Sequence, residues 1–376
     1  MPRVAAVVLA LLCVSFAFVG AQQPRPDDPK AETLPKSEQN FDRLDTAIRK
    51  HMAKLKAGCA TVAVSKNGRS VYSQGYGNLG DANKSPTPPD AMMRIASLTK
   101  PITMALVRKA FLDGQLKPED TVFDMLQPKF QREVKLSDER IKLITVQHLL
   151  DHKGGWDSNR SGDPMFMTRK IEPTLKPKRA ATAQDVVEYW LAKPLEYPPG
   201  TREIYSNFGY CLLGRILELK YGKPYLQLVR ETIADPLKIV DIGLGRTTKA
   251  KRNPREPAYP VDDGEFSLEV MDAHGGLIAS APAVCQFLEV YWLDGRTRKP
   301  KQWGDWALFG SLPGTTSLAR QRKDGYSIVV LINSRLEATM QKDNDLLLKE
   351  LDKAFDAIVG PAMETSPEKP PEKPKE

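Results

Sequence analysis

The sequence predicts an α/β (α+β) protein: a helix-flanked antiparallel sheet built from both chain ends, with an inserted all-helical subdomain. Near the start, residues 60–65 and 70–76 flank Asn67-Gly68, a strong signal for a two-residue hairpin turn. Near the end, residues 316–333 repeat this arrangement around Asp324-Gly325. The chain between the hairpins shows helical periodicity. One layer made from the two ends is therefore expected to carry a helical insertion.

Helical spacing identifies the other elements in order. A helix opens the body, because Phe41, Leu44, Ile48 and Met52 recur at intervals of three and four. The interior helices, most of them in a subdomain of roughly 115–270, are expected at 102–112, 146–150, 183–191, 207–220 and 225–233. A last helix from about 345 to 359 stops at Gly360-Pro361, the usual order for a helix end.

Composition places the chain among globular proteins. It has 376 residues, 55 basic and 47 acidic side chains, and a formal net charge of +8. An apolar fraction of 41% with 27% charged residues excludes fibrous, collagen-like and fully disordered chains. Segments 22–40 and 361–376 are rich in Pro and charge and are predicted to be disordered. The folded domain is expected at 41–360.

Residues 1–21 have the layout of a cleaved secretory signal peptide. A short basic start precedes an apolar run from Val4 to Val19, which is shorter than the ~20 residues that span a bilayer. Small side chains at Val19 and Ala21 fit cleavage before Gln22, and an uncleaved anchor is the alternative. The mature protein is therefore expected to be exported, and to be periplasmic or extracellular.

Export makes the cysteines and the positive charge informative. Without the signal peptide, Cys59, Cys211 and Cys285 remain, an odd number in apolar surroundings, so buried free thiols are expected instead of a disulfide framework. Basic clusters lie at 246–255 and 296–301. In an exported protein they indicate a solvated face or contact with an anionic cell envelope, and not a nucleic-acid partner.

Candidate chemistry begins at Ser97-Leu98-Thr99-Lys100. Residues three apart share a helix face, so the Lys100 amine can reach the Ser97 hydroxyl and act as its base. Ser366 begins a second Ser-x-x-Lys, so the pattern alone is weak, and a plain capping serine is the alternative for Ser97. Ser97, however, begins a helix in which Pro101 falls in the tolerant first turn. The helix dipole there favours developing negative charge.

Two later segments add complementary groups. Tyr205-Ser206-Asn207 follows a turn and enters a helix, and a Tyr hydroxyl beside a Lys amine is a credible proton shuttle for an attacking Ser. Residues 308–315 precede the strand expected at 316–322. A backbone amide in that segment can pair with the amide of Ser97 to bind an oxyanion.

In this order and spacing, the three segments resemble the penicillin-recognising serine hydrolases, nearest to the branch of class C β-lactamases, DD-peptidases and related esterases. The resemblance covers about 41–359. It includes four further stretches, namely His148-Leu149-Leu150-Asp151-His152, Gly200-Thr201, Asp235-Pro236-Leu237 and His274-Gly275-Gly276-Leu277. No single motif is specific, but the ordered set is. One small departure is Gly154-Gly155, where a Ser-Gly pair is common.

The resemblance implies a role for each matched position. Ser97 would be the nucleophile, Lys100 and Tyr205 the proton-transfer pair, and Asn207 a polar contact for substrate. The backbone amides of Ser97 and Ser311 would form the oxyanion hole. The implied reaction passes through an acyl-enzyme on Ser97, with no metal or organic cofactor, on a small-molecule, peptide or ester substrate.

The third segment departs from the family pattern. Where the family usually has Lys or His, then Thr or Ser, then Gly, this chain has Leu308, Phe309 and Gly310. In the β-lactam and D-alanyl-D-alanine enzymes the polar pair helps to bind a substrate carboxylate. Its loss predicts a preference for neutral esters or amides, unless a nearby cation such as Arg320, or one from 296–301, supplies the missing charge.

Two alternatives stay open. His148 and His152 are four residues apart and can face one metal, close to the inverted zinc motif His-x-x-Glu-His. No third carboxylate ligand is evident, however, and Asp151 is short for the usual base. The other alternative is a catalytically inactive protein that keeps the fold to bind a cell-wall or protein partner, which Leu308-Phe309 favours.

Overall fold

The computed structural model describes residues 40–81, 84–261, 266–299 and 302–359. The predicted signal peptide and C-terminal tail, and all of the predicted linker except Asn40, lie outside these residues. Within the described residues, no helix combines the length and the apolarity needed to cross a membrane.

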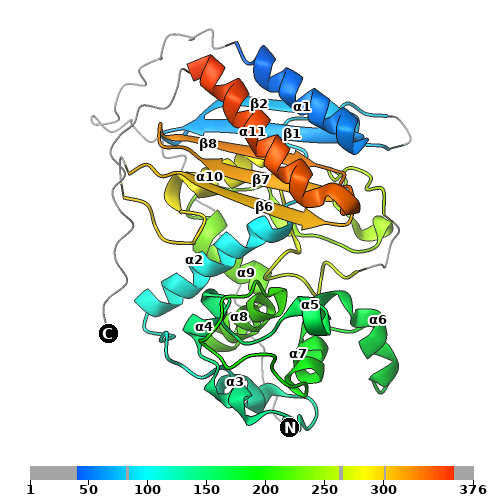
Figure 1. Ribbon diagram of the computed structural model, residues 1–376, viewed down its shortest axis with the longest axis vertical. Coiled ribbons are helices and arrows are strands. Elements are labelled where there is room, and N and C mark those ends of the chain that lie inside the picture. Colours follow the sequence, from blue (N-terminus) through cyan, green and yellow to red (C-terminus); the bar gives the residue numbers. More distant parts are fainter. Residues whose placement is uncertain (1–39, 82–83, 262–265, 300–301, 360–376) are drawn as a thin grey trace, which may run out of the picture. The chain divides into compact units, whose positions relative to one another are not determined.

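The main sheet joins the two ends of the chain, as predicted. Its five antiparallel strands stand in the order β2-β1-β8-β7-β6, so β1 from the N-terminal hairpin pairs with β8 from the C-terminal one (Figure 1). The strands are β1 (Cys59–Lys66), β2 (Arg69–Gly77), β6 (Trp306–Leu312), β7 (Thr315–Gln321) and β8 (Tyr326–Ile332). Strand β6, which the sequence analysis did not assign, forms one edge.

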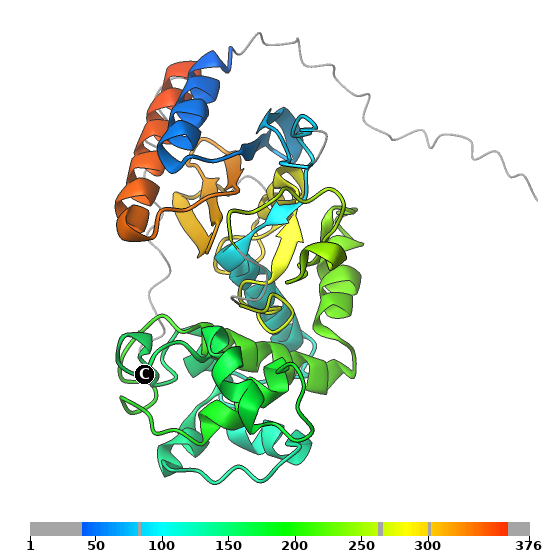
Figure 2. The same cartoon turned by 90° about the vertical axis from the view of Figure 1, so that its right-hand side faces the viewer.

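Alternate side chains of β1 pack into two different hydrophobic cores. Val62 and Val64 point to the face covered by α1 (Asp42–Leu55) and α11 (Met340–Val359), which pack side by side (Figures 1 and 2). Cys59 and Ala63 point to the other face, where α10 (Ala281–Val290) lies. Because β1 is buried on both faces, a slip of one residue would exchange its two apolar sets.

Helix α11 begins at Met340, earlier than the expected 345. Its first turn is polar and so lacks the apolar spacing that marks the rest of the helix. Asp343 favours a helix start, because a carboxylate is stabilised there by the helix dipole. This side chain also pairs with Lys54 of α1 at 2.6 Å.

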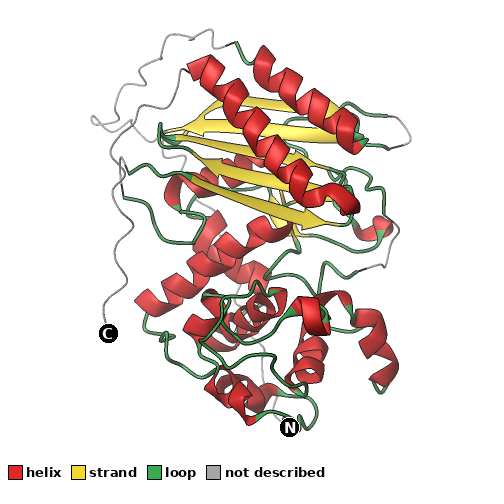
Figure 3. Cartoon of the chain, in the orientation of Figure 1, coloured by secondary structure: helices red, strands yellow, loops and turns green. Residues whose placement is uncertain are grey.

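The insertion is helical, as expected, and forms a separate layer beyond β6 (Figure 3). Its helices are α3 (Val122–Leu126), α4 (Val146–Leu150), α5 (Ser158–Ser161), α6 (Thr168–Ile171), α7 (Ala183–Leu191), α8 (Asn207–Tyr221) and α9 (Tyr225–Val229). The helix expected at 225–233 is α9 followed by a π-helical turn, Arg230–Ala234. Beyond that turn, the described part of the range 115–270 holds a short strand, a 3₁₀ turn at Lys249–Lys251 and loops.

A second, three-stranded sheet was not expected from the sequence. It consists of β3 (Met93–Arg94), β4 (Ile242–Leu244) and β5 (Leu277–Ala279), in the order β3-β5-β4. Strands of two or three residues are too short to show an alternating pattern. Helix α2 (Thr99–Leu112) leaves this small sheet and shares the core of the α10 face with the helical layer.

Candidate active site

Ser97 sits where the small sheet turns into α2. Strand β3 leads into a single 3₁₀ turn, Ala96–Leu98, and α2 follows directly. Ala96 has a φ of 47°, a left-handed conformation that non-glycine residues rarely adopt. Such strain persists when the surrounding structure fixes it, and it is frequent at functional sites. Pro101 falls in the first turn of α2, as expected.

Lys100 is buried one turn further on, with 2% of its surface exposed. Its Nζ donates to Ser97 Oγ at 3.2 Å, to Asn207 Oδ1 at 2.7 Å and to the His274 carbonyl at 2.9 Å. These three acceptors match the three N–H groups of an ammonium. The pairing of β3 with β5 brings the His274 carbonyl here, because β5 starts just after the His274-Gly275-Gly276 segment.

Tyr205 lies on the solvent side of Ser97. The two hydroxyl oxygens are 2.7 Å apart, and the Tyr205 ring centre is 4.6 Å from Lys100 Nζ. Tyr205 is 48% exposed, so substrate and water can reach its hydroxyl. The structure therefore brings together Ser97, Lys100 and Tyr205 from segments more than 100 residues apart.

Asn207 holds Lys100 in place. Its Oδ1 accepts from Lys100, while its Nδ2 donates to Asp163 Oδ2 at 2.6 Å, so the orientation of the amide is fixed. Each end of the amide thus has one partner in the protein, and the contact with substrate that the sequence analysis expected stays a prediction. Asp163 was not identified from the sequence. It caps a short turn through Met165 N–H, and burial raises its pKa.

His152 supports the segment that carries Tyr205. Its ring stacks on the Tyr205 ring at 4.8 Å, and its Nδ1 accepts the backbone N–H of Ser206 at 3.1 Å. Its own carbonyl accepts the N–H of Ile204 at 2.8 Å. Burial, and secondarily the charge of Lys100, lowers the pKa of His152 to about 4. The imidazole is therefore neutral near pH 7 and acts as a hydrogen-bond acceptor.

His148 supports the same loop from the preceding turn. A Cβ on Gly200 would lie 2.9 Å from His148 Nε2, so the turn needs glycine there, and Gly200 has a φ of 81°. His148 Nδ1 accepts the N–H of Thr145 in a capping box. Among the described residues, no group of three or more His, Cys, Asp or Glu is placed to hold a metal ion. The two histidines support the loop that leads into Tyr205, which is called the tyrosine loop below. The described residues provide no set of metal ligands for the metallohydrolase alternative.

Packing explains the Gly154-Gly155 departure. A Cβ on Gly154 would lie 2.6 Å from the Trp156 ring, so the tryptophan occupies the space that a serine would need. Gly155 has a φ of 101°, and a Cβ there would lie 2.5 Å from the Tyr197 carbonyl. Both glycines are therefore fixed by packing.

Gly310 forms the junction between β6 and the nucleophile. A Cβ at this position would lie 2.8 Å from the Ser97 backbone nitrogen and 2.6 Å from the Ile95 carbonyl. The Pro313-Gly314 turn makes Leu312 and Thr315 a hydrogen-bonded pair, as the register of β6 and β7 requires.

Hydrogen-bonded and non-hydrogen-bonded residue pairs alternate along β6 and β7, so the next pair, which contains Ser311, is not hydrogen-bonded. The N–H of Ser311 therefore points away from β7, outwards from the open edge of the sheet. This amide follows directly on the glycine that abuts Ser97. The arrangement fits an oxyanion hole made from the amides of Ser97 and Ser311.

Neither Leu308 nor Phe309 offers a charge at this edge. Leu308 packs against the core of the α10 face, and Phe309 packs against the core under α1 and α11. Arg320, considered as a replacement cation, points elsewhere: it pairs with Asp305 and, through Nε at 3.1 Å, with Asp352. In the other candidate loop, Arg298 donates to the Leu288 carbonyl and Arg296 pairs with Asp294 at 2.5 Å.

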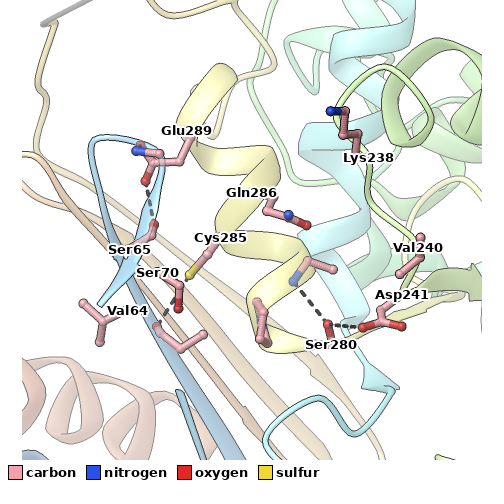
Figure 4. A pocket seen from close by; sticks show the side chains of 14 residues that line it. Val64, Ser65, Ser70, Lys238, Val240, Asp241, Ser280, Cys285, Gln286 and Glu289 are labelled. Carbon is pink, nitrogen blue, oxygen red and sulfur yellow. Dashed lines mark hydrogen bonds between the residues drawn. The ribbon is translucent and has the colours of Figure 1, made fainter. Parts of the chain in front are cut away.

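A separate cavity of about 270 Å³ lies between α10 and the β1–β2 hairpin (Figure 4). Two pairs of its polar lining residues are bonded to each other: Ser65 donates to Glu289 at 2.6 Å, and Ser280 donates to Asp241 at 3.3 Å. Cys285, one of three buried free cysteines among the described residues, also lines it. None of the residues implied in acyl transfer contributes to this cavity.

Known proteins show the same fold and related sequences. A penicillin-binding protein homologue from Pyrococcus abyssi has a TM-score of 0.64 at 20% identity, covering 85% of this chain and 78% of its own. A D-amino acid amidase from Ochrobactrum anthropi SV3 has a TM-score of 0.63 at 20% identity, covering 85% of this chain and all of its own.

Two curated sequences are similar over part of their length. Esterase EstB of Burkholderia gladioli is 25% identical over 256 residues, which is 64% of this chain and 62% of that protein. A putative D-alanyl-D-alanine carboxypeptidase of Escherichia coli K12 is 26% identical over 239 residues, which is 61% of this chain and 52% of that protein. The chain thus spans about half the length of the curated relatives it matches.

The match to the Beta-lactamase family extends over residues 44–348, nearly all of the described body. Residues 44–348 contain every segment that resembles the penicillin-recognising hydrolases. The relatives of this chain include hydrolases of esters, amides and peptides. The chain therefore belongs to the Beta-lactamase family.

Proposed function

We propose that this protein is an exported serine hydrolase that works through an acyl-enzyme on Ser97. One observation carries the proposal: Ser97 Oγ contacts Tyr205 Oη at 2.7 Å and Lys100 Nζ at 3.2 Å, while the backbone of Gly310 abuts the Ser97 amide. A nucleophile, a proton acceptor and oxyanion donors thus converge on one point.

Acylation follows from these positions. Ser97 Oγ attacks the substrate carbonyl carbon, and its proton passes through Tyr205 Oη to the pair formed by Tyr205 and Lys100. The amides of Ser97 and Ser311 bind the oxyanion that forms. When the tetrahedral intermediate collapses, the bond to the leaving group breaks and Tyr205 returns the proton to that group. An ester of Ser97 remains.

Deacylation reverses the roles. A water molecule gives its proton to Tyr205 Oη as its oxygen bonds to the acyl carbon, and the bond to Ser97 Oγ then breaks. The proton returns to Ser97, and the carboxylic acid leaves. Since Tyr205 is 48% exposed, water reaches its hydroxyl without rearrangement of the loop.

Esters and amides are the proposed substrate classes. Support comes from the relatives, which include an esterase and a putative D-alanyl-D-alanine carboxypeptidase. An amide demands protonation of its leaving nitrogen, and Tyr205 stands where it can supply that proton.

A fluorophosphonate probe tests the proposal. We expect covalent labelling of the purified protein, with the modified peptide mapping to Ser97. Ser97→Ala should abolish labelling and lower ester hydrolysis more than ~10³-fold. The matched control is Ser366→Ala, which removes the other Ser-x-x-Lys serine and should change neither. An unlabelled but folded wild-type protein would support the inactive binding protein instead.

Export is part of the same proposal. Its support is the signal-like pattern of residues 1–21. Expression of the full chain in a bacterial host should yield a mature form outside the cytoplasm that begins at Gln22. A cytoplasmic protein that retains Met1 would contradict it.

A further inference from the structure

One end of the main sheet carries an exposed surface of aromatic and basic side chains. The register pairs Lys66 with Tyr326, so the β1–β2 turn and the β7–β8 turn lie next to each other at this end. A Cβ on Gly325 would lie 3.4 Å from Asn67 Oδ1 in the first turn and 3.4 Å from the ring of Trp303. Trp303 therefore lies over the two turns, and it is 37% exposed.

An arginine links Trp303 to the start of β6. The Arg298 guanidinium lies 5.5 Å from the ring centre of Trp303 and 4.7 Å from that of Trp292, within the range of cation–π attraction. The Trp292 ring is buried and lies 6.4 Å from the ring of Trp306, which is 38% exposed. The three other tryptophans of the chain are buried. Both exposed indoles thus lie at the same end of the sheet.

Basic side chains surround the two indoles. Among the described residues, no carboxylate pairs with any of these four cations at the turns and beside Arg298: Lys66, Arg69, Lys299 and Lys323. The carboxylates nearby already have partners in the protein. Asp324 pairs with Arg322 at 2.8 Å, Asp305 pairs with Arg320, and Glu289 accepts from the β1–β2 hairpin. We call Trp303, Trp306 and the four cations the sheet-end patch.

The described chain begins and ends beside this patch. Phe41, just before α1, stacks at 4.3 Å on the ring of Tyr72, which stands opposite Val64 near the end of β1. Asp356, in the last turn of α11, pairs at 2.6 Å with Arg322 beside the β7–β8 turn. Figure 1 shows the start of β6 and the end of α11 (red) on the left of the sheet.

The candidate active site lies at the other end of β6. Five residues separate Trp306 from Ser311, which corresponds to about 17 Å along an extended strand. A surface bound at the sheet-end patch therefore leaves the entrance to Ser97 open.

We propose that the sheet-end patch docks the protein onto an anionic lipid bilayer. Indole rings favour the boundary between lipid headgroups and hydrocarbon, and lysine and arginine near an anionic bilayer are attracted to it. The cations alone would suit any polyanion, but two exposed indoles among them favour a partner with an apolar interior. The docking is peripheral, and it does not depend on the chemistry proposed for Ser97.

Vesicle binding tests the proposal on the mature form that begins at Gln22, so that the apolar run of residues 4–19 contributes nothing. We expect binding to vesicles that mix phosphatidylcholine and phosphatidylglycerol in a three-to-one ratio, and much weaker binding to phosphatidylcholine alone. Raising the salt from ~0.1 M to ~1 M should release the protein, because the screening length falls from ~10 Å to ~3 Å. Brominated acyl chains should quench the tryptophan fluorescence of the bound protein, since only Trp303 and Trp306 can reach them.

Charge variants locate the contact. The double variant of Lys299→Gln and Lys323→Gln should weaken binding to the mixed vesicles by about 25-fold, or about fivefold for each charge. The matched control combines Lys117→Gln with Lys129→Gln, which removes the same charge from exposed lysines beside the helical layer. The control should stay within about threefold of wild type.

Tryptophan variants test the lipid contact itself. Trp303→Ala and Trp306→Ala should each weaken binding by roughly 10–40-fold, the value of burying ~60–90 Å² of indole surface. Each should also lose part of the quenching. The control is Leu112→Ala, which removes a leucine that is 82% exposed at the end of α2 and should not change binding.

Three results would overturn the proposal. The first is equal binding of the wild-type protein to mixed and neutral vesicles. The second is an equal loss in the two lysine double variants, which would show that net charge and not the patch attracts the protein. The third is unchanged binding of both tryptophan variants, which would show a contact by charge alone, as a soluble polyanion makes. If a tryptophan variant does not fold, quenching of the bound wild-type protein decides, and its absence overturns the lipid contact.

Discussion

The two halves of the candidate site are built in opposite ways. In the acid–base half, the three donors of Lys100 have partners inside the protein, and Asn207 is fixed in turn by Asp163. In the half formed by β6, Leu308 and Phe309 pack against the two cores, and the contact with Ser97 is made by the backbone of Gly310. The first half thus positions the reacting atoms through side chains, whereas the second holds Ser97 through close packing of backbone. Removing a side chain should therefore break the first half, and adding one should break the second.

The largest effect should come from breaking the acid–base half. Tyr205→Phe removes the hydroxyl 2.7 Å from Ser97 Oγ and keeps the ring that stacks on His152. We expect kcat for a neutral aryl ester to fall by ~10²–10⁴, the usual contribution of a positioned acid–base group. Tyr221→Phe, which removes a surface hydroxyl that bonds to Asp113, is the matched control. A Tyr205→Phe enzyme within threefold of wild type would remove Tyr205 from the mechanism.

The next effect tests the junction between the halves. Gly310→Ala places a methyl group 2.3 Å from Ser317 Oγ and 2.8 Å from the Ser97 nitrogen, so β6 and the nucleophile must move apart. A displacement of about 1 Å can reduce turnover ~10²-fold, and we expect a loss of that size in kcat, with slower fluorophosphonate labelling.

Gly275→Ala is the control for that substitution. Its methyl group would come no closer than 3.8 Å to a neighbouring atom, so it should have a much smaller effect on turnover. Equal losses in the two variants would show that the Gly310 contact with Ser97 does not set the geometry.

Sequence reasoning found what is local or strongly patterned. Ser97 and Lys100 lie one helical turn apart, and Tyr205 precedes a helix with a clear start, so each stands in a recognisable context. The hairpins around Asn67-Gly68 and Asp324-Gly325 were placed correctly because turn residues with left-handed backbone mark them. Those two hairpins supply four of the five strands of the main sheet.

What the sequence missed depends on contacts between distant segments. Asp163 is a single charged residue with no local spacing to mark it, and only the fold brings it to Asn207. Strand β6 was missed because Trp306-Ala307-Leu308-Phe309 does not alternate apolar and polar, as an edge strand with two partly covered faces need not. The contact of the basic clusters with an anionic envelope stays a prediction, although Arg255 is already paired with Asp241 at 2.6 Å.

The smallest effect on turnover is expected at His152, which supports the acid–base half without touching the reacting atoms. Asn is the closest replacement, because it tolerates the left-handed backbone at this position (φ 55°) and can still accept the N–H of Ser206. We expect His152→Asn to lower kcat by no more than ~10-fold at pH 7, since it keeps this anchor and loses the ring contacts with Tyr205 and Tyr210.

The same variant should change how stability depends on pH. The folded-state pKa of His152 is about 4, against 6.5 for a free imidazole, so between these values the unfolded chain binds a proton that the folded protein excludes. The contribution of neutral His152 to the unfolding free energy is therefore complete above pH 6.5. It is lost as the pH falls towards 4, and the loss is at most about 3 kcal/mol. The pKa values of His51, His148 and His274 are also lowered by burial, so these groups act in the same direction.

Urea unfolding at pH 7.5 and pH 4.5 isolates His152: the wild-type protein should lose more stability than His152→Asn over this interval. Equal losses would mean that His152 titrates normally in the folded state, and that a neutral acceptor is not what holds the tyrosine loop.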